Sequence, residues 1–368
     1  MLLLIVLVML FGRLGVLHKF ETITLDAEAR LNTPPANSSV AIVNIVDDDY
    51  DNLFGSTSPL HPDKLRELID AIAKGQPKVI GVDIDTSDTQ FRDGLRVPPS
   101  WPPVVWERVV KDLPESTDEK PEPLSVLGGS DPARDRDSGL ALLIQDSEDK
   151  VVRRYQRLID TAEGPLPSFA WSIMQKFAPD KTAALDERAA PLLIKFSGDR
   201  EGSHRLEFTA AKLLDLAPSW EKAPASSPLY KKIVLLGGSY RGQDRHDTPL
   251  GKMIGVRVIA NVIETELDGG GYGPPGKVTV ALLEIFDGFV LLLLFHFLTT
   301  ARATAISMVI IPLLALVCSF ISFGSFSRWA YFAPVLLGVL LFELYNHYRH
   351  HAIPHLYEEI SGAGGHEK

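Results

Sequence analysis

Two short stretches decide the fold class: VAIVNIV at positions 40–46 and KVIGVDI at positions 78–84. Both are continuous apolar runs rich in β-branched residues, which is typical of parallel strands that are buried on both faces. Between them, Pro62 starts a helical spacing of leucine and isoleucine residues, and Gly75 ends it. This order predicts a strand–helix–strand unit with a right-handed crossover.

The same kinds of pattern continue through the charged middle of the chain. Ser168 precedes an apolar helical pattern that reaches position 177, so we predict an N-capped helix there. Further apolar runs predict strands at 104–106, 151–159, 192–196 and 232–236, the last of which ends in Gly237 and Gly238. We therefore expect an α/β domain with a mixed or mainly parallel sheet flanked by helices.

Both ends of the chain are apolar and predict transmembrane helices. Three runs at 278–298, 303–323 and 329–348 are each long enough to span the ~30 Å hydrocarbon layer of a bilayer. Residues 1–17 form a shorter apolar run without a signal-peptide cleavage pattern. We predict an N-terminal transmembrane anchor at 1–19, an extracytoplasmic domain at 20–275, a three-helix transmembrane region at 276–348 and a short cytoplasmic tail at 349–368.

Charge and cysteine content limit the location and the partners of the protein. Cys318 is the only cysteine and lies in a predicted span, which excludes an intramolecular disulfide and a cysteine-based zinc site in the domain. The formal net charge of -10 and the lack of a Lys/Arg-rich stripe argue against nucleic acid as a partner. We expect a multi-pass protein of the bacterial cytoplasmic membrane whose domain faces the periplasm or the cell exterior. The spans also contain Glu284, Asp287 and Glu343, which we expect to face a neighbouring helix or to lie at a helix end.

Polar residues gather where the predicted strands end. Open α/β sheets bind ligands in the crevice at the carboxyl ends of their strands, and clustered carboxylates there can hold a cation or shift one another's pKa. The candidate ligand-binding residues are Asp47, Asp48, Asp83, Asp85, Arg241, Asp244, His246, Asp247 and Thr248. In the alternative interpretation, these aspartates cap helices and tighten turns.

Familiar catalytic and metal motifs are incomplete in this chain. An EF-hand loop starting at Asp47 would have Asn52 and Ser58 where glycine and glutamate are required. Gly238 does not begin a nucleophile elbow, because Arg241 occupies the place of the second glycine. We predict no catalytic residues and no metal ligands, and no cofactor is implied. An Asp/His metal-dependent hydrolase stays a third hypothesis.

Several short blocks follow one another along the chain: Leu25-Asp26 with Arg30-Leu31, Val46-Asp47-Asp48, residues 79–84, residues 150–154 with 167–170, and residues 247–251 with Gly255 and Ala260-Asn261. Together these blocks resemble the second-type CHASE domain, whose name abbreviates cyclases/histidine kinases associated sensory extracellular. They cover nearly all of residues 21–267. The chain departs from the family at Ile259, where histidine is frequent, and follows its pattern poorly over residues 87–138.

The resemblance implies an N-terminal span, an extracytoplasmic sensor and three closely spaced spans before a cytoplasmic output domain. Only twenty residues follow Tyr348, too few for a cyclase or kinase domain, so we expect the output to lie on a separate cytoplasmic or membrane protein. The leading hypothesis is a membrane-anchored sensor, expected to form a homo-oligomer, that binds a small ligand or reads an envelope condition and signals through its spans. The alternative is an interaction subunit of a membrane or envelope complex without a small-molecule ligand.

Overall fold

The structure, a computed structural model, describes residues 18–31, 33–95, 97–111, 120–129, 134–187, 190–197 and 205–273, together with positions 285 and 289. The chain divides into two compact units. One consists of Ala29–Tyr272, and the other of Met1–Glu28 with Gly273–Lys368. The first unit holds the sheet and all of the candidate ligand-binding residues.

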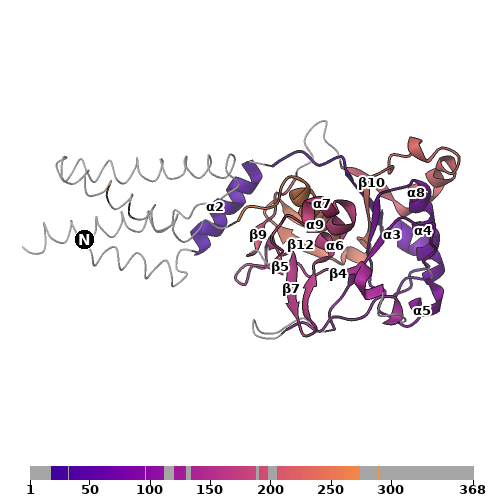
Figure 1. Cartoon of the computed structure of the whole chain (residues 1–368), viewed down its shortest axis with the longest axis horizontal. Coiled ribbons are helices and arrows are strands. Elements are labelled where there is room, and N and C mark those ends of the chain that lie inside the picture. Colours follow the sequence, from indigo (N-terminus) through magenta and orange to yellow (C-terminus); the bar gives the residue numbers. More distant parts are fainter. Residues whose placement is uncertain are drawn as a thin grey trace, which may run out of the picture. The chain divides into compact units, whose positions relative to one another are not determined.

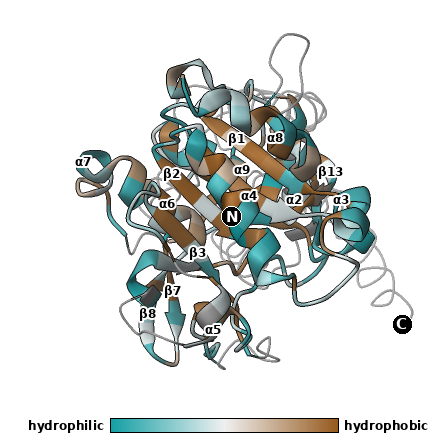
Figure 2. Ribbon diagram, turned by 90° about the vertical axis from the view of Figure 1, so that its right-hand side faces the viewer, coloured by the Kyte–Doolittle hydropathy of each residue, from teal (hydrophilic) through white to brown (hydrophobic). Residues whose placement is uncertain are grey.

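A six-stranded sheet forms the centre of this unit (Figure 1). Its spatial order is β10 (Leu206–Thr209), β1 (Val40–Ile45), β11 (Ile233–Gly238), β2 (Val79–Asp83), β3 (Val104–Arg108) and β4 (Ser138–Leu140). Every neighbouring pair of strands is parallel. The ribbons of β1 and β2 are hydrophobic along most of their length (Figure 2), because both faces of the sheet are covered. The prediction of an α/β fold with a parallel sheet is confirmed.

The predicted strand–helix–strand unit is present, with one difference in the sheet. Helix α4 (Pro62–Lys74) joins β1 to β2, begins at the expected proline and ends before Gly75. The two strands are not neighbours, however, because β11 pairs with both of them. A strand from much later in the sequence therefore occupies the centre of the sheet.

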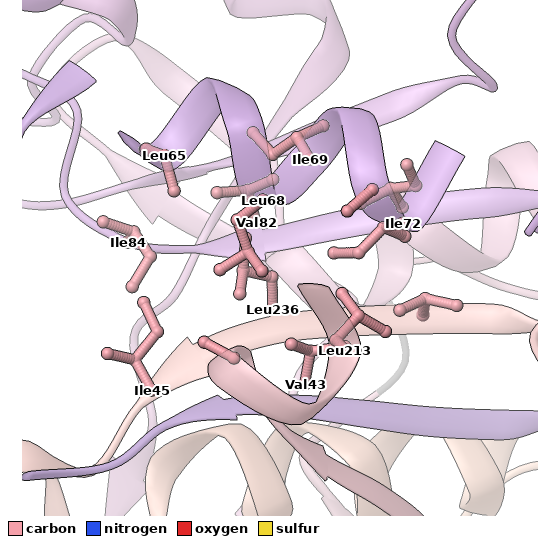
Figure 3. Packing of buried hydrophobic residues seen from close by; sticks show 14 of the residues in the cluster. Val43, Ile45, Leu65, Leu68, Ile69, Ile72, Val82, Ile84, Leu213 and Leu236 are labelled. Atoms are coloured by element: carbon pink, nitrogen blue, oxygen red, sulfur yellow. The ribbon is translucent and has the colours of Figure 1, made fainter. Parts of the chain in front are cut away.

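Helices α4 and α8 (Ala210–Leu216) cover one face of the sheet. Alternate strand residues such as Val43, Val82 and Leu236 point to this face and pack with Leu68 of α4 and Leu213 of α8 (Figure 3). This cluster consists of aliphatic and aromatic side chains that are almost completely buried. The face is a conventional hydrophobic core.

The opposite face is covered by two other helices, α6 (Phe169–Phe177) and α9 (Gly255–Leu267). Ile42 and Leu235, which alternate with the residues of the first face, pack here with Ile173 of α6. Ser168 caps α6, since its Oγ accepts a hydrogen bond from the backbone N–H of Trp171 at 3.3 Å. The predicted N-capped helix is confirmed.

Three small antiparallel sheets lie outside the main sheet. They pair β5 (Ile144–Gln145), β6 (Val152–Tyr155) and β9 (Leu192–Leu193); β7 (Leu158–Thr161) and β8 (Gly164–Pro167); and β12 (Arg245–Thr248) and β13 (Gly251–Ile254). The prediction of a single strand at 151–159 is wrong, because β6 and β7 belong to two different sheets. Hydrophobic alternation indicates that a segment is extended, but it does not reveal which strands it pairs with.

The remaining helices among the described residues are α2 (His18–Leu31), which has 14 residues, and the shorter α3 (Asp47–Asn52), α5 (Phe91–Gly94) and α7 (Pro179–Thr182), together with several 3₁₀ turns. Within the described ranges, no helix has the length and apolar character needed to cross a bilayer. The predicted spans lie almost wholly outside these ranges, as do Cys318, Glu284, Asp287 and Glu343, and the spans stay predictions.

Candidate functional site

Two carboxylates lie on neighbouring strands where β2 and β3 end. Asp83 is the last residue of β2, and Glu107 follows Trp106 in β3. Val82 pairs with Trp106 across the two strands, so the next position on each strand brings Asp83 and Glu107 to the same face of the sheet. The parallel register therefore joins two acids that are well separated in the sequence.

The segment between β11 and β12 lies at the same edge of the sheet and contributes Asp244. Asp244 has a positive φ of 55°, and its backbone oxygen accepts a hydrogen bond from the N–H of Gly255 at 2.9 Å. Its carboxylate packs so closely on Gly255 that a Cβ atom there would clash with it. Its Oδ1 also lies 2.8 Å from Nε2 of His246. A glycine at the start of α9 thus allows the Asp244 carboxylate to approach the helix.

A cavity of about 390 Å³, here called the acidic cavity, opens between these elements. Its polar lining residues are Asp83, Asp85, Glu107, Gln145, Tyr240, Gln243, Asp244 and His246. The rest of its lining is formed by Ile84, Ala141, Leu142, Leu143, Gly238, Gly255 and Ile259. Its volume is in the range of small-molecule sites, roughly 300–1,000 Å³. Its position at the carboxyl ends of parallel strands is where open α/β sheets bind their ligands.

Two of the acidic groups in this cavity, Asp83 and Glu107, have a raised pKa. Burial, followed by the negative charge of Asp244, raises the pKa of Asp83 well above its usual value. Burial is also the largest cause that raises the pKa of Glu107, and Asp83, Asp85 and Asp244 add to it. Among the described residues that line the cavity there is no lysine and no arginine. The carboxylates therefore share a space without a fixed compensating cation.

Four of the nine candidate residues line the acidic cavity: Asp83, Asp85, Asp244 and His246. The other five lie elsewhere on the same edge or in the β12–β13 hairpin. Asp47 accepts a hydrogen bond from the backbone N–H of Arg241, whose guanidinium lies 4.9 Å from the ring centre of Tyr50. Asp48 is exposed on α3.

The last two candidates stabilise the hairpin. Asp247 forms an exposed ion pair with Lys252 at 3.1 Å, and the Thr248 hydroxyl donates to the backbone oxygen of Gly251 at 2.6 Å. Both contacts connect the two strands of one hairpin. Their geometry accounts for both side chains without a ligand.

The alternative interpretation, that aspartates cap helices and tighten turns, holds for several acids. Asp49 is buried and accepts hydrogen bonds from the backbone N–H groups of Ala210 and Ala211 at 2.9 and 3.1 Å, which caps α8. Asp85 accepts from the backbone N–H of Ser87 at 2.9 Å while it also lines the cavity. Asp47 and Asp49, which follow β1, thus have structural roles, whereas Asp83 and Asp85, at and after the end of β2, line the cavity.

Sequence reasoning missed Glu107 and Tyr240. Glu107 directly follows the predicted strand at 104–106, so the rule used for the other strand ends could have identified it. Tyr240 stacks on Tyr50 with a ring-centre distance of 4.2 Å and lines the cavity. No group of three or more His, Cys, Asp or Glu side chains in the described ranges is placed to hold a metal ion.

A polar cluster surrounds the far end of α9. Glu266 is buried and accepts hydrogen bonds from Nε and Nη2 of Arg157 at 2.9 and 3.0 Å and from the Tyr155 hydroxyl. Tyr155 accepts in turn from the backbone N–H of Gly271 at 3.1 Å. Burial, followed by the charge of Glu266, raises the pKa of Tyr155, so this phenol stays a hydrogen-bond donor. The cluster connects α9 to the last residues of this unit.

A second buried ion pair is formed two residues earlier in α9. Glu264 accepts hydrogen bonds from Nε and Nη2 of Arg205 at 2.9 and 2.8 Å and from the Ser197 hydroxyl at 2.8 Å. Asn261 accepts from the backbone N–H of Ser197 at 2.8 Å. The second half of α9 is therefore fixed by directional bonds rather than by apolar contacts alone.

A search of the curated proteins and a search of the solved structures each found no match. The model of the CHASE2 domain matches residues 1–300, which is more than half of the chain and includes the whole sheet. The resemblance seen in the sequence is thus confirmed, and the chain belongs to the CHASE2 family of extracytoplasmic sensory domains.

Proposed function

We propose that the protein is a membrane-anchored, non-enzymatic sensor whose extracytoplasmic domain binds a small ligand in the acidic cavity. Family membership supports the sensory role. The cavity supports the ligand, because its volume and its place at the carboxyl edge of the sheet are those of a small-molecule site. The incomplete catalytic motifs favour binding without catalysis.

One observation carries this proposal: α9 connects the acidic cavity to the end of the domain. Gly255 and Ile259, in the first half of α9, line the cavity. Glu266, near the end of the same helix, holds Arg157 and Tyr155, and Tyr155 binds Gly271. A ligand that contacts the start of α9 therefore acts on the element that positions residues 270–272.

The proposed signal leaves the domain through the residues that follow α9. Beyond position 273 the sequence continues into the three apolar runs that predict transmembrane helices. A ligand shifts the position of α9 only if it binds one arrangement of the helix more tightly than the other. In this proposal the spans lie in the bacterial cytoplasmic membrane and pass that shift to a separate output protein.

The first test identifies small molecules that co-purify with the full-length protein. The protein is purified from its native membrane in mild detergent, and bound molecules are released and identified by mass spectrometry. Leu142→Trp fills the cavity, and Leu216→Trp changes a leucine that is 36% exposed on α8 and serves as the matched control. We expect a stoichiometric molecule with the wild type and the control but not with Leu142→Trp. Equal recovery from all three proteins contradicts the cavity as the ligand site.

Proteins recovered in the same preparations separate the sensor from the interaction subunit. A kinase, cyclase or other output protein whose recovery changes with Leu142→Trp supports signalling in trans. A stoichiometric partner that is recovered equally with both variants, without a bound small molecule, favours an interaction subunit. The cavity-filling variant thus distinguishes two functions that share the same membrane location.

A further inference from the structure

Four carboxylates line the acidic cavity from three directions. Asp83 and Asp85 belong to the end of β2, Glu107 to β3 and Asp244 to the segment before β12. Among the described lining residues, His246 alone can carry a positive charge, and its Nε2 already lies 2.8 Å from Asp244. Clefts lined by charges of one sign concentrate ligands of the opposite sign.

Two of these carboxylates differ from the others in their contacts with the described part of the chain. Neither Asp83 nor Glu107 makes a hydrogen bond or an ion pair with any residue in the described ranges, and burial is the largest cause of the raised pKa of each. The buried carboxylates of Asp49 and Glu266, in contrast, accept hydrogen bonds from backbone N–H groups or from arginine. Asp83 and Glu107 are only partly buried, so a cation that enters the cavity can reach two carboxylates that are free to accept from it.

The rest of the lining favours an organic cation over a metal ion. The described carboxylates are not arranged as a metal site. Ile84, Leu142, Leu143 and Ile259 give the cavity an apolar part, and the last three also line a small adjoining pocket with Phe169. Such a surface stabilises hydrocarbon and offers nothing to a hydrated ion.

An aromatic ring completes this set of contacts. Tyr240 lines the cavity while its ring stacks on Tyr50, and aromatic rings attract ammonium groups. We infer that the ligand of the acidic cavity is an organic cation, a protonated amine that carries an apolar portion, and this inference rests on the function proposed above. The ammonium group binds Asp83 and Glu107, and the apolar portion contacts Leu142 and its neighbours.

The experiment measures binding of four probes to the full-length protein in mild detergent by calorimetry and thermal shift. Hexylammonium carries both features of the inferred ligand, whereas hexanol and hexanoate keep the chain and change the charge, and Mg²⁺ keeps a positive charge without a chain. We expect hexylammonium to raise the unfolding temperature. Hexanol, hexanoate and Mg²⁺ at the same concentration should leave it unchanged.

Matched substitutions locate the binding site. Glu107→Gln and Asp83→Asn remove a negative charge from the cavity with little change in shape, and each should weaken hexylammonium binding by about 10- to 100-fold. Glu148→Gln and Asp215→Asn make the same changes at exposed positions and should have no effect. Equal weakening by the exposed substitutions would show a nonspecific response to net charge and would overturn the inference.

Proton release on ligand binding is a measurement that a purely structural effect of the substitutions would not change. The raised pKa of Asp83 and Glu107 keeps protons on these groups to a higher pH than usual, and a bound cation displaces them. Affinity should therefore increase with pH, and calorimetry in buffers of different ionisation enthalpy should detect released protons. The other titratable groups that line the cavity around Asp83 and Glu107 are Asp85, Tyr240, Asp244 and His246.

The outcomes separate this inference from the proposed function. Hexanol or hexanoate binding that Leu142→Trp abolishes overturns the cationic ligand but keeps the cavity as a ligand site. Stabilisation by Mg²⁺ that Glu107→Gln abolishes overturns the organic ligand in favour of a metal ion. If none of the four probes binds, the inferred ligand class is wrong, and the co-purification experiment decides independently whether the cavity holds another molecule.

Discussion

Helices α4 and α9 have the same length and cover opposite faces of one sheet, yet they are held in different ways. Each has 13 residues. The buried residues of α4 are all apolar, whereas α9 buries Asn261, Glu264, Thr265 and Glu266 in its second half. Hydrophobic burial, which has no preferred direction, holds α4, while hydrogen bonds and ion pairs also fix the rotation and depth of α9.

Helix α4 is therefore a scaffold, whereas the hydrogen bonds and ion pairs of α9 allow that helix only a few positions. Apolar contacts tolerate small shifts, but a buried ion pair is either formed or broken, and in some proteins such pairs contribute conformational specificity at a cost in stability. The first residues of α9 line the acidic cavity. For the proposed sensor, a helix with discrete arrangements suits transmission better than one that yields continuously.

The largest effect is expected when the α9 cluster loses one partner. Glu266→Ala leaves Arg157, whose side chain is 7% exposed, without its carboxylate and should lower the free energy of unfolding by about 4 kcal/mol. Chemical denaturation of the full-length protein in mild detergent, followed by tryptophan fluorescence, measures this loss. The double variant Arg157→Met with Glu266→Leu removes both charges and should recover most of the stability. An equally unstable double variant would show that packing, and not the charge pair, holds α9.

A somewhat smaller loss is expected from the apolar helix. Leu68 of α4 is 1% exposed within the hydrophobic cluster, so Leu68→Ala should lower the free energy of unfolding by about 3 kcal/mol through lost burial and a new cavity. Leu68→Met nearly conserves volume and should cost less than about 1.5 kcal/mol in the same denaturation experiment. Hexylammonium binding should be unchanged in both variants, because α4 lies on the face opposite α9. A loss of binding would mean that the two faces are coupled.

The third change tests an acid that is structural rather than ligand-binding. Asp49→Ala leaves two backbone N–H groups at the start of α8 without acceptors and should lower the free energy of unfolding by about 2 kcal/mol. Asp48→Ala, its exposed neighbour, should change stability by less than about 0.5 kcal/mol. Denaturation of both variants measures the difference. Equal effects would contradict the role of Asp49 as the cap of α8.

Local sequence patterns predicted much of the scaffold but not the order of its strands. The runs at 40–46 and 78–84 are recognisable because buried parallel strands have a distinctive composition. The insertion of β11 between β1 and β2 depends on strand pairing between distant segments, which places Leu236 opposite Val43 on one side and opposite Val82 on the other. No local pattern encodes such pairings.

The order of the strands in the sheet also determines which acidic side chains lie next to one another. Asp47 and Asp83 both follow predicted strands, but β11 separates those strands, and the acids after β1 enter α3. Asp83 instead meets Glu107, because β3 is the other neighbour of β2. The sequence therefore predicted four of the residues that line the acidic cavity, while the remaining neighbours depended on strand order.

The smallest expected effects compare the caps of one helix on each face. Ser168 and Thr209 each accept a hydrogen bond at 3.3 Å from a backbone N–H in the first turn of α6 and α8. The bond to Trp171 is buried, whereas the bond to Lys212 is exposed, so water can replace the lost hydroxyl only at α8. Ser168→Ala should thus cost about 1 kcal/mol and Thr209→Ala about 0.5 kcal/mol in the same denaturation experiment. If Thr209→Ala costs more stability than Ser168→Ala, water does not replace the lost hydroxyl at α8. Burial then does not explain the difference between the two caps.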